Sequence, residues 1–246
     1  MNPKILIAGP EANAGYLQPY ADAVSGAGGE VELDLPAKET TNDENALKEF
    51  LRPFQGVLLP GGTDIEPGRY GEGPHERLKP PDCGLDESQL AIARFVLRHD
   101  LPTLAICRGL QILAVAVGFD LFQDLSSQRP SSVNHLMSGP ENKNKMAHEV
   151  VLDENSRLAR LSGSARFQVN SRHHQAIRER DATGWAGPFK VVARAPDGVV
   201  EGMEHPAQPF LVAVQWHPEN LTADHSPSQG LFRGFIEAAG RAHKSR

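Results

Sequence analysis

Cysteine is scarce in this chain of 246 residues: Cys83 and Cys107 are too few for a framework of disulfide bonds. Long apolar runs are missing as well, and none approaches the ~20 residues that a membrane-spanning helix needs. Residues 1–10 predict a β-strand and are too short and too weakly basic for a signal peptide. We therefore expect a cytoplasmic protein with no membrane partner.

The patterns of several common ligand sites are also absent. A net charge of −6 at pH 7 argues against nonspecific binding to nucleic acid. The glycine-rich turn at 60–62 lacks the Lys-Ser/Thr of a phosphate-binding loop, and neither His-Glu-x-x-His nor Cys-x-x-Cys occurs. We expect no cofactor and no metal, because the adjacent His173 and His174 would face opposite ways in a strand. Most of the other histidines are expected at the surface, among them His135, His148, His205, His225 and His243.

Strand-like runs alternate with helical ones, which predicts an α/β fold with an open, mostly parallel sheet and helices on both faces. Without an internal repeat or a linker, residues 1–246 are expected to form a single domain. Segments 64–86 and 126–147 carry no strong pattern. We expect the first to cover the site as a loop, and the second to be a solvated excursion or a lid. The expected strands are 4–8, 30–35, 56–59, 101–105 and 211–214, and the expected helices are 16–27, 43–50, 86–97 and 112–117.

Cys107 lies between a predicted strand and a predicted helix. Gly109 allows a tight turn there, and the start of a helix offers unpaired N–H groups and a positive dipole end that stabilise a thiolate. This placement predicts a nucleophile. The alternative is a small buried hydrophobic residue.

His217 and Glu219 follow another apolar strand. Pro218 disfavours helix at His217, so the triplet is expected to be extended, with His217 and Glu219 on the same side. The carboxylate would then accept from one ring nitrogen and leave the other for a thiol. The alternative is a strand-ending histidine beside a helix-capping glutamate.

The Pro60-Gly61-Gly62 turn also follows a strand and would bring bare backbone close to a ligand. Its N–H groups, with that of the residue after the nucleophile, would stabilise the oxyanion of a tetrahedral intermediate. An ordinary turn is the alternative. The glycine turn, Cys107 and His217 each follow a strand, and ligands of an open parallel sheet bind beyond the carboxyl ends of its strands.

Four segments in this order resemble the class I glutamine amidotransferase-like hydrolases. They are 60–67 (PGGTDIEP), 106–111 (ICRGLQ), 169–175 (VNSRHHQ) and 215–219 (QWHPE). Within that group they resemble peptidase family C26, and in particular its γ-glutamyl-γ-aminobutyrate hydrolase type. The resemblance implies a flavodoxin-like fold.

Site roles follow from this resemblance position by position. Cys107 would be the nucleophile, His217 the general base and acid, and Glu219 the group that orients His217. The backbone N–H groups of Gly62 and Arg108 would form the oxyanion hole.

The resemblance also implies substrate-binding roles for Gln111, Ser171, Arg172 and His173. The chain departs from the family pattern at 118–124, where it has GFDLFQD instead of GGTLYQD. Because this segment follows the helix after the nucleophile, we expect it to alter packing rather than chemistry.

The implied reaction is hydrolysis of a γ-glutamyl amide through a thioester, with a small γ-glutamyl compound such as γ-glutamyl-γ-aminobutyrate as substrate. The same residues would also suit a glutaminase subunit that supplies ammonia to a separate synthase, or a hydrolase of folate poly-γ-glutamate. An inactive small-molecule-binding regulator is the alternative outside the enzymes. The leaving amine and the oligomeric state, for which a homodimer stays open, are not fixed by these patterns.

Overall fold

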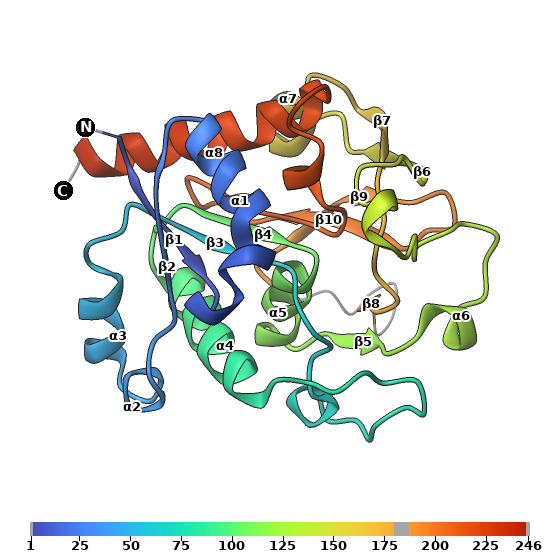
Figure 1. Ribbon diagram of the computed structural model, residues 1–246, viewed down its shortest axis with the longest axis horizontal. Coiled ribbons are helices and arrows are strands. Elements are labelled where there is room, and N and C mark those ends of the chain that lie inside the picture. Colours follow the sequence, from blue (N-terminus) through green and yellow to red (C-terminus); the bar gives the residue numbers. More distant parts are fainter. Residues whose placement is uncertain (1, 180–186, 245–246) are drawn as a thin grey trace.

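Nine strands form one open sheet in the part of the chain that the structure describes, residues 2–179 and 187–244 (Figure 1). In this computed structural model the strand order is β2-β1-β3-β4-β11-β10-β9-β6-β7. The strands from β2 to β11 pair in parallel, in the 2-1-3-4-5 order of flavodoxin-like folds. From β11 onward the pairing is antiparallel. The nine strands are β1 (Lys4–Ala8), β2 (Glu30–Asp34), β3 (Gly56–Leu59), β4 (Thr103–Ile106), β6 (His148–Leu152), β7 (Arg166–Val169), β9 (Lys190–Arg194), β10 (Val200–Glu204) and β11 (Leu211–Val214).

The structure confirms the predicted open, mostly parallel sheet with helices on both faces. Side chains of β1 show the cause, because strand neighbours point to opposite faces. Leu6 belongs to the same apolar cluster as residues of α3 (Glu44–Leu51), α4 (Cys83–Arg98) and α5 (Arg108–Ala116). Ile5 and Ile7 belong to the other cluster, with residues of α1 (Ala14–Gly26), α7 (Arg157–Ser162) and α8 (Ser226–Lys244). None of the three has exposed surface, and burial of each stabilises the fold by about 1.5–3 kcal/mol. The antiparallel pairing of the strands beyond β11 was not part of the prediction.

The four helices that the sequence predicts begin one to four residues from their expected starts, whereas the other four α-helices of the described residues were not predicted. Asp43 caps α3 by accepting from the N–H groups of Asn45 and Ala46, and Asp82 caps α4 by accepting from Leu85. The second cap starts α4 earlier than the predicted residue 86. No helix within the described ranges is long and apolar enough to cross a membrane. The helices are α1 (Ala14–Gly26), α2 (Lys38–Thr41), α3 (Glu44–Leu51), α4 (Cys83–Arg98), α5 (Arg108–Ala116), α6 (Leu125–Gln128), α7 (Arg157–Ser162) and α8 (Ser226–Lys244).

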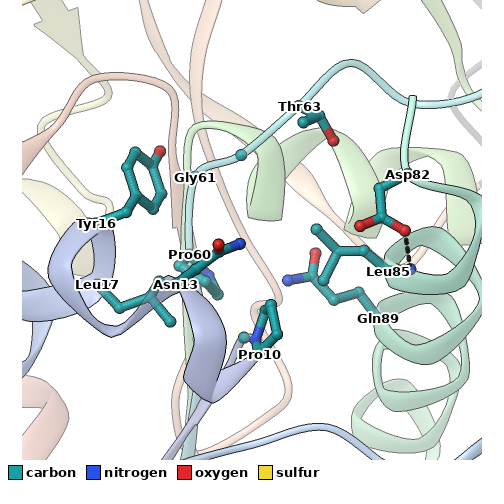
Figure 2. Close-up of a pocket in the computed structure, with 12 residues that line it drawn as sticks. Pro10, Asn13, Tyr16, Leu17, Pro60, Gly61, Thr63, Asp82, Leu85 and Gln89 are labelled. Carbon is teal, nitrogen blue, oxygen red and sulfur yellow. Dashed lines mark hydrogen bonds between the residues drawn. The ribbon is translucent and has the colours of Figure 1, made fainter. Parts of the chain in front are cut away.

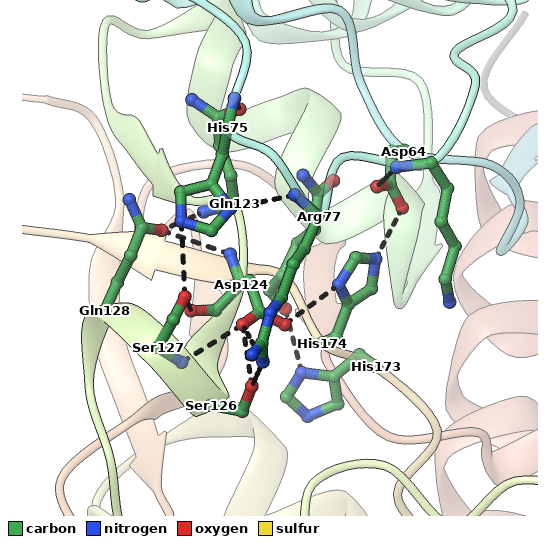
Figure 3. A network of polar contacts seen from close by, with 12 residues as sticks. Asp64, His75, Arg77, Gln123, Asp124, Ser126, Ser127, Gln128, His173 and His174 are labelled. Carbon is green, nitrogen blue, oxygen red and sulfur yellow. Dashed lines mark hydrogen bonds and ion pairs between the residues drawn. The ribbon is translucent and has the colours of Figure 1, made fainter.

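A network of hydrogen bonds and ion pairs holds segment 64–86 in place (Figure 3). His174 lies between two carboxylates, with Nε2 2.9 Å from Asp64 Oδ1 and Nδ1 3.5 Å from Asp124 Oδ1. Arg77 Nη1 reaches Asp124 Oδ2 at 3.3 Å. The segment is therefore attached to the region around β5 (Asp120–Phe122), which pairs with β8 (Ala176–Arg178) in a separate two-stranded sheet.

Candidate active site

Three adjacent parallel strands end at the same edge of the sheet, as the sequence predicts. The turn at 60–62 follows β3, Cys107 follows β4, and the segment 215–219 follows β11. The Cys107 N–H donates to the carbonyl of Val214 at 2.8 Å, so the ends of β4 and β11 are joined directly. Three segments that are far apart in sequence therefore meet at one edge.

Cys107 has an unusual backbone conformation, with φ 53° and ψ −104°. Among the described non-glycine residues it alone has a positive φ. Such a conformation costs on the order of 1–3 kcal/mol and is concentrated at functional sites. The residue forms the sharp strand-to-helix turn that the sequence predicts, and it is 7% exposed.

Position 109 must be glycine because the backbone at the end of β3 lies very close to it, and not because of its own dihedral angles. A Cβ at this position would lie 2.2 Å from the carbonyl oxygen of Leu59, at the end of β3. The first turn of α5 can therefore approach β3 only with glycine here. This contact brings Cys107 next to the turn at 60–62.

His217 and Glu219 form a buried pair, with 2.7 Å between Nδ1 and Oε1. The expected extended conformation of the triplet is wrong, because Pro218–Asn220 form a 3-10 turn. The turn still places the carboxylate against the ring. Asn220 Nδ2 donates to the same Oε1 at 2.8 Å and fixes the carboxylate.

The ring of His217 lies between two groups that favour its charged form. Burial, the largest influence, lowers the pKa of His217, but the charge of Glu219 and the charge and hydrogen bond of Cys107 outweigh it and raise the pKa to about 10. His217 and Cys107 are therefore arranged as an imidazolium beside a sulfur.

Tyr20 is a neighbour of His217 that the sequence analysis missed. Its hydroxyl accepts from the Gly61 N–H at 3.1 Å and lies 3.5 Å from His217 Nδ1. Burial, with the charge of Glu219, raises the pKa of Tyr20 well above its ordinary value, so the hydroxyl stays protonated. Spacing offered one signal: Tyr16 and Tyr20 are four residues apart on α1 and share a face.

Asn170 is the second residue that was missed as an individual, although it lies in the 169–175 segment. Its Oδ1 accepts from the His217 N–H at 2.9 Å, and its Nδ2 donates to the His217 carbonyl at 2.9 Å. The side chain is fully buried. It therefore fixes the main chain of His217 on both sides.

The glycine turn packs tightly against these groups. A Cβ on Gly61 would lie 2.7 Å from the Tyr20 hydroxyl and 3.1 Å from His217 Cε1, and a Cβ on Gly62 would lie 2.8 Å from Arg108 Cδ. Arg108 is the first residue of α5, so its N–H has no acceptor within the helix. The two N–H groups proposed as an oxyanion hole therefore belong to segments in contact.

The Arg108 side chain points into the protein. Its guanidinium donates to Asp86 Oδ1 and Gln89 Oε1, and Asp86 Oδ2 accepts from the Glu66 N–H at 2.9 Å. Arg108 and Asp86 are both almost fully buried. The buried Arg108–Asp86 pair packs against the turn at 60–62, and no sequence pattern predicted it.

A cavity of about 390 Å³ adjoins the turn (Figure 2). It lies beyond the carboxyl ends of β1 and β3, where the strand order reverses and such folds bind ligands. Gly61 and Gly62 form part of its wall, and Gly61 also contacts His217. Asn13, Tyr16 and Gln89 supply polar atoms to the lining.

The four predicted substrate-binding residues are placed differently from one another. Gln111 is buried, and its Nε2 donates to the carbonyl of Gln175 at 3.1 Å. Ser171 Oγ donates to the carbonyl of His135 at 2.9 Å, and His173 Nδ1 bonds the carbonyl of Gln175 at 2.8 Å, so both side chains point into the protein.

Arg172 is half-buried, and its positive charge lowers the pKa of the Tyr16 hydroxyl. Burial, followed by the charge of Cys107, raises the pKa of Tyr16 to about 12, and the charge of Arg172 opposes this. Of the four predicted side chains, Arg172 has the electrostatic connection to the Cys107 region. The substrate roles of all four stay predictions.

Comparisons with known proteins agree with this arrangement. The family model described as Peptidase C26 matches residues 8–219. Protein NtpR of Enterococcus hirae is 34% identical over 221 residues, which cover 89% of this chain and 87% of that protein. Gamma-glutamyl-gamma-aminobutyrate hydrolase PuuD of Escherichia coli is 34% identical over 224 residues, which cover 89% of this chain and 84% of that protein.

Solved structures show the same fold. The glutaminase domain of Trypanosoma brucei CTPS, solved with bound acivicin, superposes with a TM-score of 0.65. The match covers 97% of this chain and 94% of that chain at 18% sequence identity, a level that supports the fold alone.

Proposed function

The chain belongs to the peptidase C26 family of glutamine amidotransferase-like hydrolases, and from this premise we propose that it hydrolyses a γ-glutamyl amide bond. The substrate we propose is γ-glutamyl-γ-aminobutyrate, which would yield glutamate and γ-aminobutyrate. The observation that carries the proposal is the buried His217–Glu219 pair at 2.7 Å beside Cys107. Similarity to the PuuD hydrolase supports the choice of substrate.

Acylation would begin from the ion pair in which His217 already holds the proton of the Cys107 thiol. The thiolate attacks the γ-carbonyl carbon, and the negative oxygen is stabilised by the N–H groups of Gly62 and Arg108. Collapse of the tetrahedral intermediate breaks the carbon–nitrogen bond. His217 gives its proton to the departing amine, and the acyl group stays on Cys107 as a thioester.

Deacylation would run the same proton path in reverse. His217 takes a proton from water, the hydroxide attacks the thioester carbon, and the oxyanion again faces the glycine turn. Glutamate leaves, and the Cys107 thiolate is released beside the protonated His217, which restores the starting ion pair. No cofactor is needed to balance either half of the reaction.

The charge on His217 requires a partner, and Glu219 supplies it at Nδ1. This occupies one ring nitrogen and leaves the other for the thiol. Tyr20 and Asn170 would act as positioning residues, because they contact the ring and the main chain of His217.

The cavity beside Gly61 is proposed as the site of the leaving amine. Gln111 and the 171–173 segment, to which the resemblance assigns the glutamyl group, are joined to each other through Gln175. The cavity is instead lined by residues that precede or follow β1 and β3, such as Asn13 and Tyr16. Its volume is in the range of small-molecule sites.

Glutamate release tests the proposal. The purified protein would be given γ-glutamyl-γ-aminobutyrate, glutamine and a short poly-γ-glutamate, with Cys107→Ala as the blank. We expect preference for the first compound and loss of release in the variant. Preference for glutamine would instead favour a glutaminase that supplies ammonia to a partner, and release that persists in Cys107→Ala would refute the mechanism.

A further inference from the structure

Three histidines and one glutamate meet in the interior, and one of them, His173, is also among the four predicted substrate-binding residues. His135 lies in the segment between α6 and β6, His148 begins β6, His173 follows β7, and Glu201 belongs to β10. Their exposed fractions are 6%, 7%, 4% and 0%. The expectation that most of the scattered histidines lie at the surface is therefore wrong for His135 and His148. The side chain of His243 lies outside the described part of the chain.

The inward-facing atoms of this cluster converge on one carboxylate oxygen. Glu201 Oε1 lies 3.4 Å from His135 Nδ1, 3.5 Å from His148 Nε2 and 3.5 Å from His173 Nε2. The ligand atoms of His135, His148 and Glu201 all lie within 4.8 Å of one another. Ligands of a tetrahedral zinc ion, with bonds of about 2.0–2.1 Å, are separated by about 3.3–3.4 Å.

The outward nitrogen of each ring faces an oxygen that can only accept. Each of these nitrogens must therefore carry a hydrogen, and in a neutral ring the inward nitrogen carries a lone pair. This arrangement is usual for metal-binding histidines, whose second nitrogen donates to a carbonyl or a carboxylate. The contacts are His148 Nδ1 to the Glu149 carbonyl at 3.1 Å, His173 Nδ1 to the Gln175 carbonyl at 2.8 Å, and His135 Nε2 to Asp197 Oδ2 at 3.0 Å.

The centre of the cluster thus holds acceptors without a donor. The three inward nitrogens and both oxygens of Glu201 have no hydrogen-bond partner. Protonation of every ring would bury three positive charges against the two carboxylates of Glu201 and Asp197, which is costly. A divalent cation balances the charges of Glu201 and Asp197 and supplies the missing partner for every inward atom.

We propose that His135, His148 and Glu201 bind a first-row divalent metal ion of the zinc class, with His173 as the fourth ligand. Imidazole nitrogens and carboxylate oxygens are zinc ligands, and a closed set of four protein ligands is the coordination of a structural zinc site. The ion is structural in this proposal, because four protein ligands leave no open position for substrate.

The ion would join segments that are hydrogen-bonded to one another and to the strand end before His217. His135 belongs to segment 126–147, and its carbonyl accepts from the His173 N–H at 2.8 Å. On the other side, the Glu201 carbonyl accepts from the Gln215 N–H at 2.8 Å, two residues before His217. Cross-linking these segments would hold segment 126–147 against the sheet.

Metal analysis tests this proposal without any variant. The full chain would be produced without a polyhistidine tag, stripped with a chelator and titrated with Co²⁺. We expect one Co²⁺ per chain, with the intense visible bands of tetrahedral cobalt, and a higher melting temperature on addition of Zn²⁺. A stripped protein that takes up neither Co²⁺ nor Zn²⁺ would overturn the proposal.

Variants then locate the site. Glu201→Gln and His148→Ala should abolish the cobalt spectrum, and Asp197→Asn, which alters a residue outside the ligand set, should weaken Co²⁺ binding about 10–100-fold. His225→Asn is the matched control, because His225 bonds Ser228 outside the cluster and should leave binding unchanged. Cobalt binding that all the cluster variants retain would assign the metal to another place and refute the proposal.

Discussion

Asn170 holds the main chain of His217 at both of its polar groups, with each contact at 2.9 Å. Replacement by alanine leaves a buried N–H and a buried carbonyl without this partner. We expect Asn170→Ala to lower kcat about 10–100-fold with a smaller change in KM, because the imidazole shifts relative to Cys107. The free energy of unfolding should fall by about 1–3 kcal/mol. Steady-state kinetics and urea unfolding measure the two effects, and Asn155→Ala, in an exposed turn, is the control.

Glu219→Gln keeps the shape of the orienting residue and removes its charge. The loss of Glu219 lowers the pKa of His217 and lets the amide hold the ring in the wrong tautomer. We expect kcat to fall by up to about 10⁴-fold. A rate within twofold of wild type at every pH would contradict the role given to Glu219.

The raised pKa of His217 also predicts how stability depends on pH. Its value of about 10 in the folded protein exceeds the value of about 6.5 for an unperturbed histidine. The stabilisation is fully present below pH 6.5 and is lost as the pH rises through about 10. Urea unfolding across this window should show a loss of stability in wild type that is smaller in His217→Asn. Equal losses in the two proteins would disprove this contribution.

The positive φ of Cys107 separates two variants that are both expected to be inactive. Alanine keeps the backbone strain, whereas glycine relieves it. We expect Cys107→Gly to be more stable than Cys107→Ala by about 1 kcal/mol, the order of the cost of a left-handed conformation for a residue with a Cβ. Thermal unfolding of the two variants side by side measures the difference, and equal melting temperatures would show that position 107 is not strained.

Asp86 is the buried partner of the Arg108 side chain. Its removal leaves an uncompensated guanidinium, so Asp86→Ala should lower the free energy of unfolding by about 3–5 kcal/mol. Glu49→Ala breaks an exposed pair with Arg52 and should cost no more than about 1 kcal/mol. Chemical unfolding compares the two variants. Similar losses of free energy of unfolding would mean that the buried Asp86–Arg108 pair contributes no more stability than an exposed pair.

Much of this arrangement could be predicted from short-range patterns. The apolar strands before Gly61, Cys107 and His217 placed these residues at the carboxyl edge of a parallel sheet, and the structure agrees. Local conformation was harder, since the 3-10 turn at Pro218 depends on packing that periodicity does not reveal.

Contacts between distant segments could not be predicted in this way. Asp86 meets Arg108 across two helices, and Glu201 lies in a strand whose residues are buried on both faces. The histidines around Glu201 come from separate segments, without the regular spacing by which a metal site is recognised in sequence. The pairing of β6, β9 and β10 and the backbone hydrogen bond between His173 and His135 bring them together.

β11 lies at the boundary between the two halves of the sheet, parallel to β4 and antiparallel to β10. Its pairing joins Leu211 to Thr103, so the strand that precedes His217 must find a partner far back along the chain. Such distant pairing is slow to form, because the loop must close before its contacts stabilise anything. Cys107 and His217 can therefore meet only after β11 has entered the sheet. In refolding or during synthesis, catalytic competence should be among the last properties that the chain acquires.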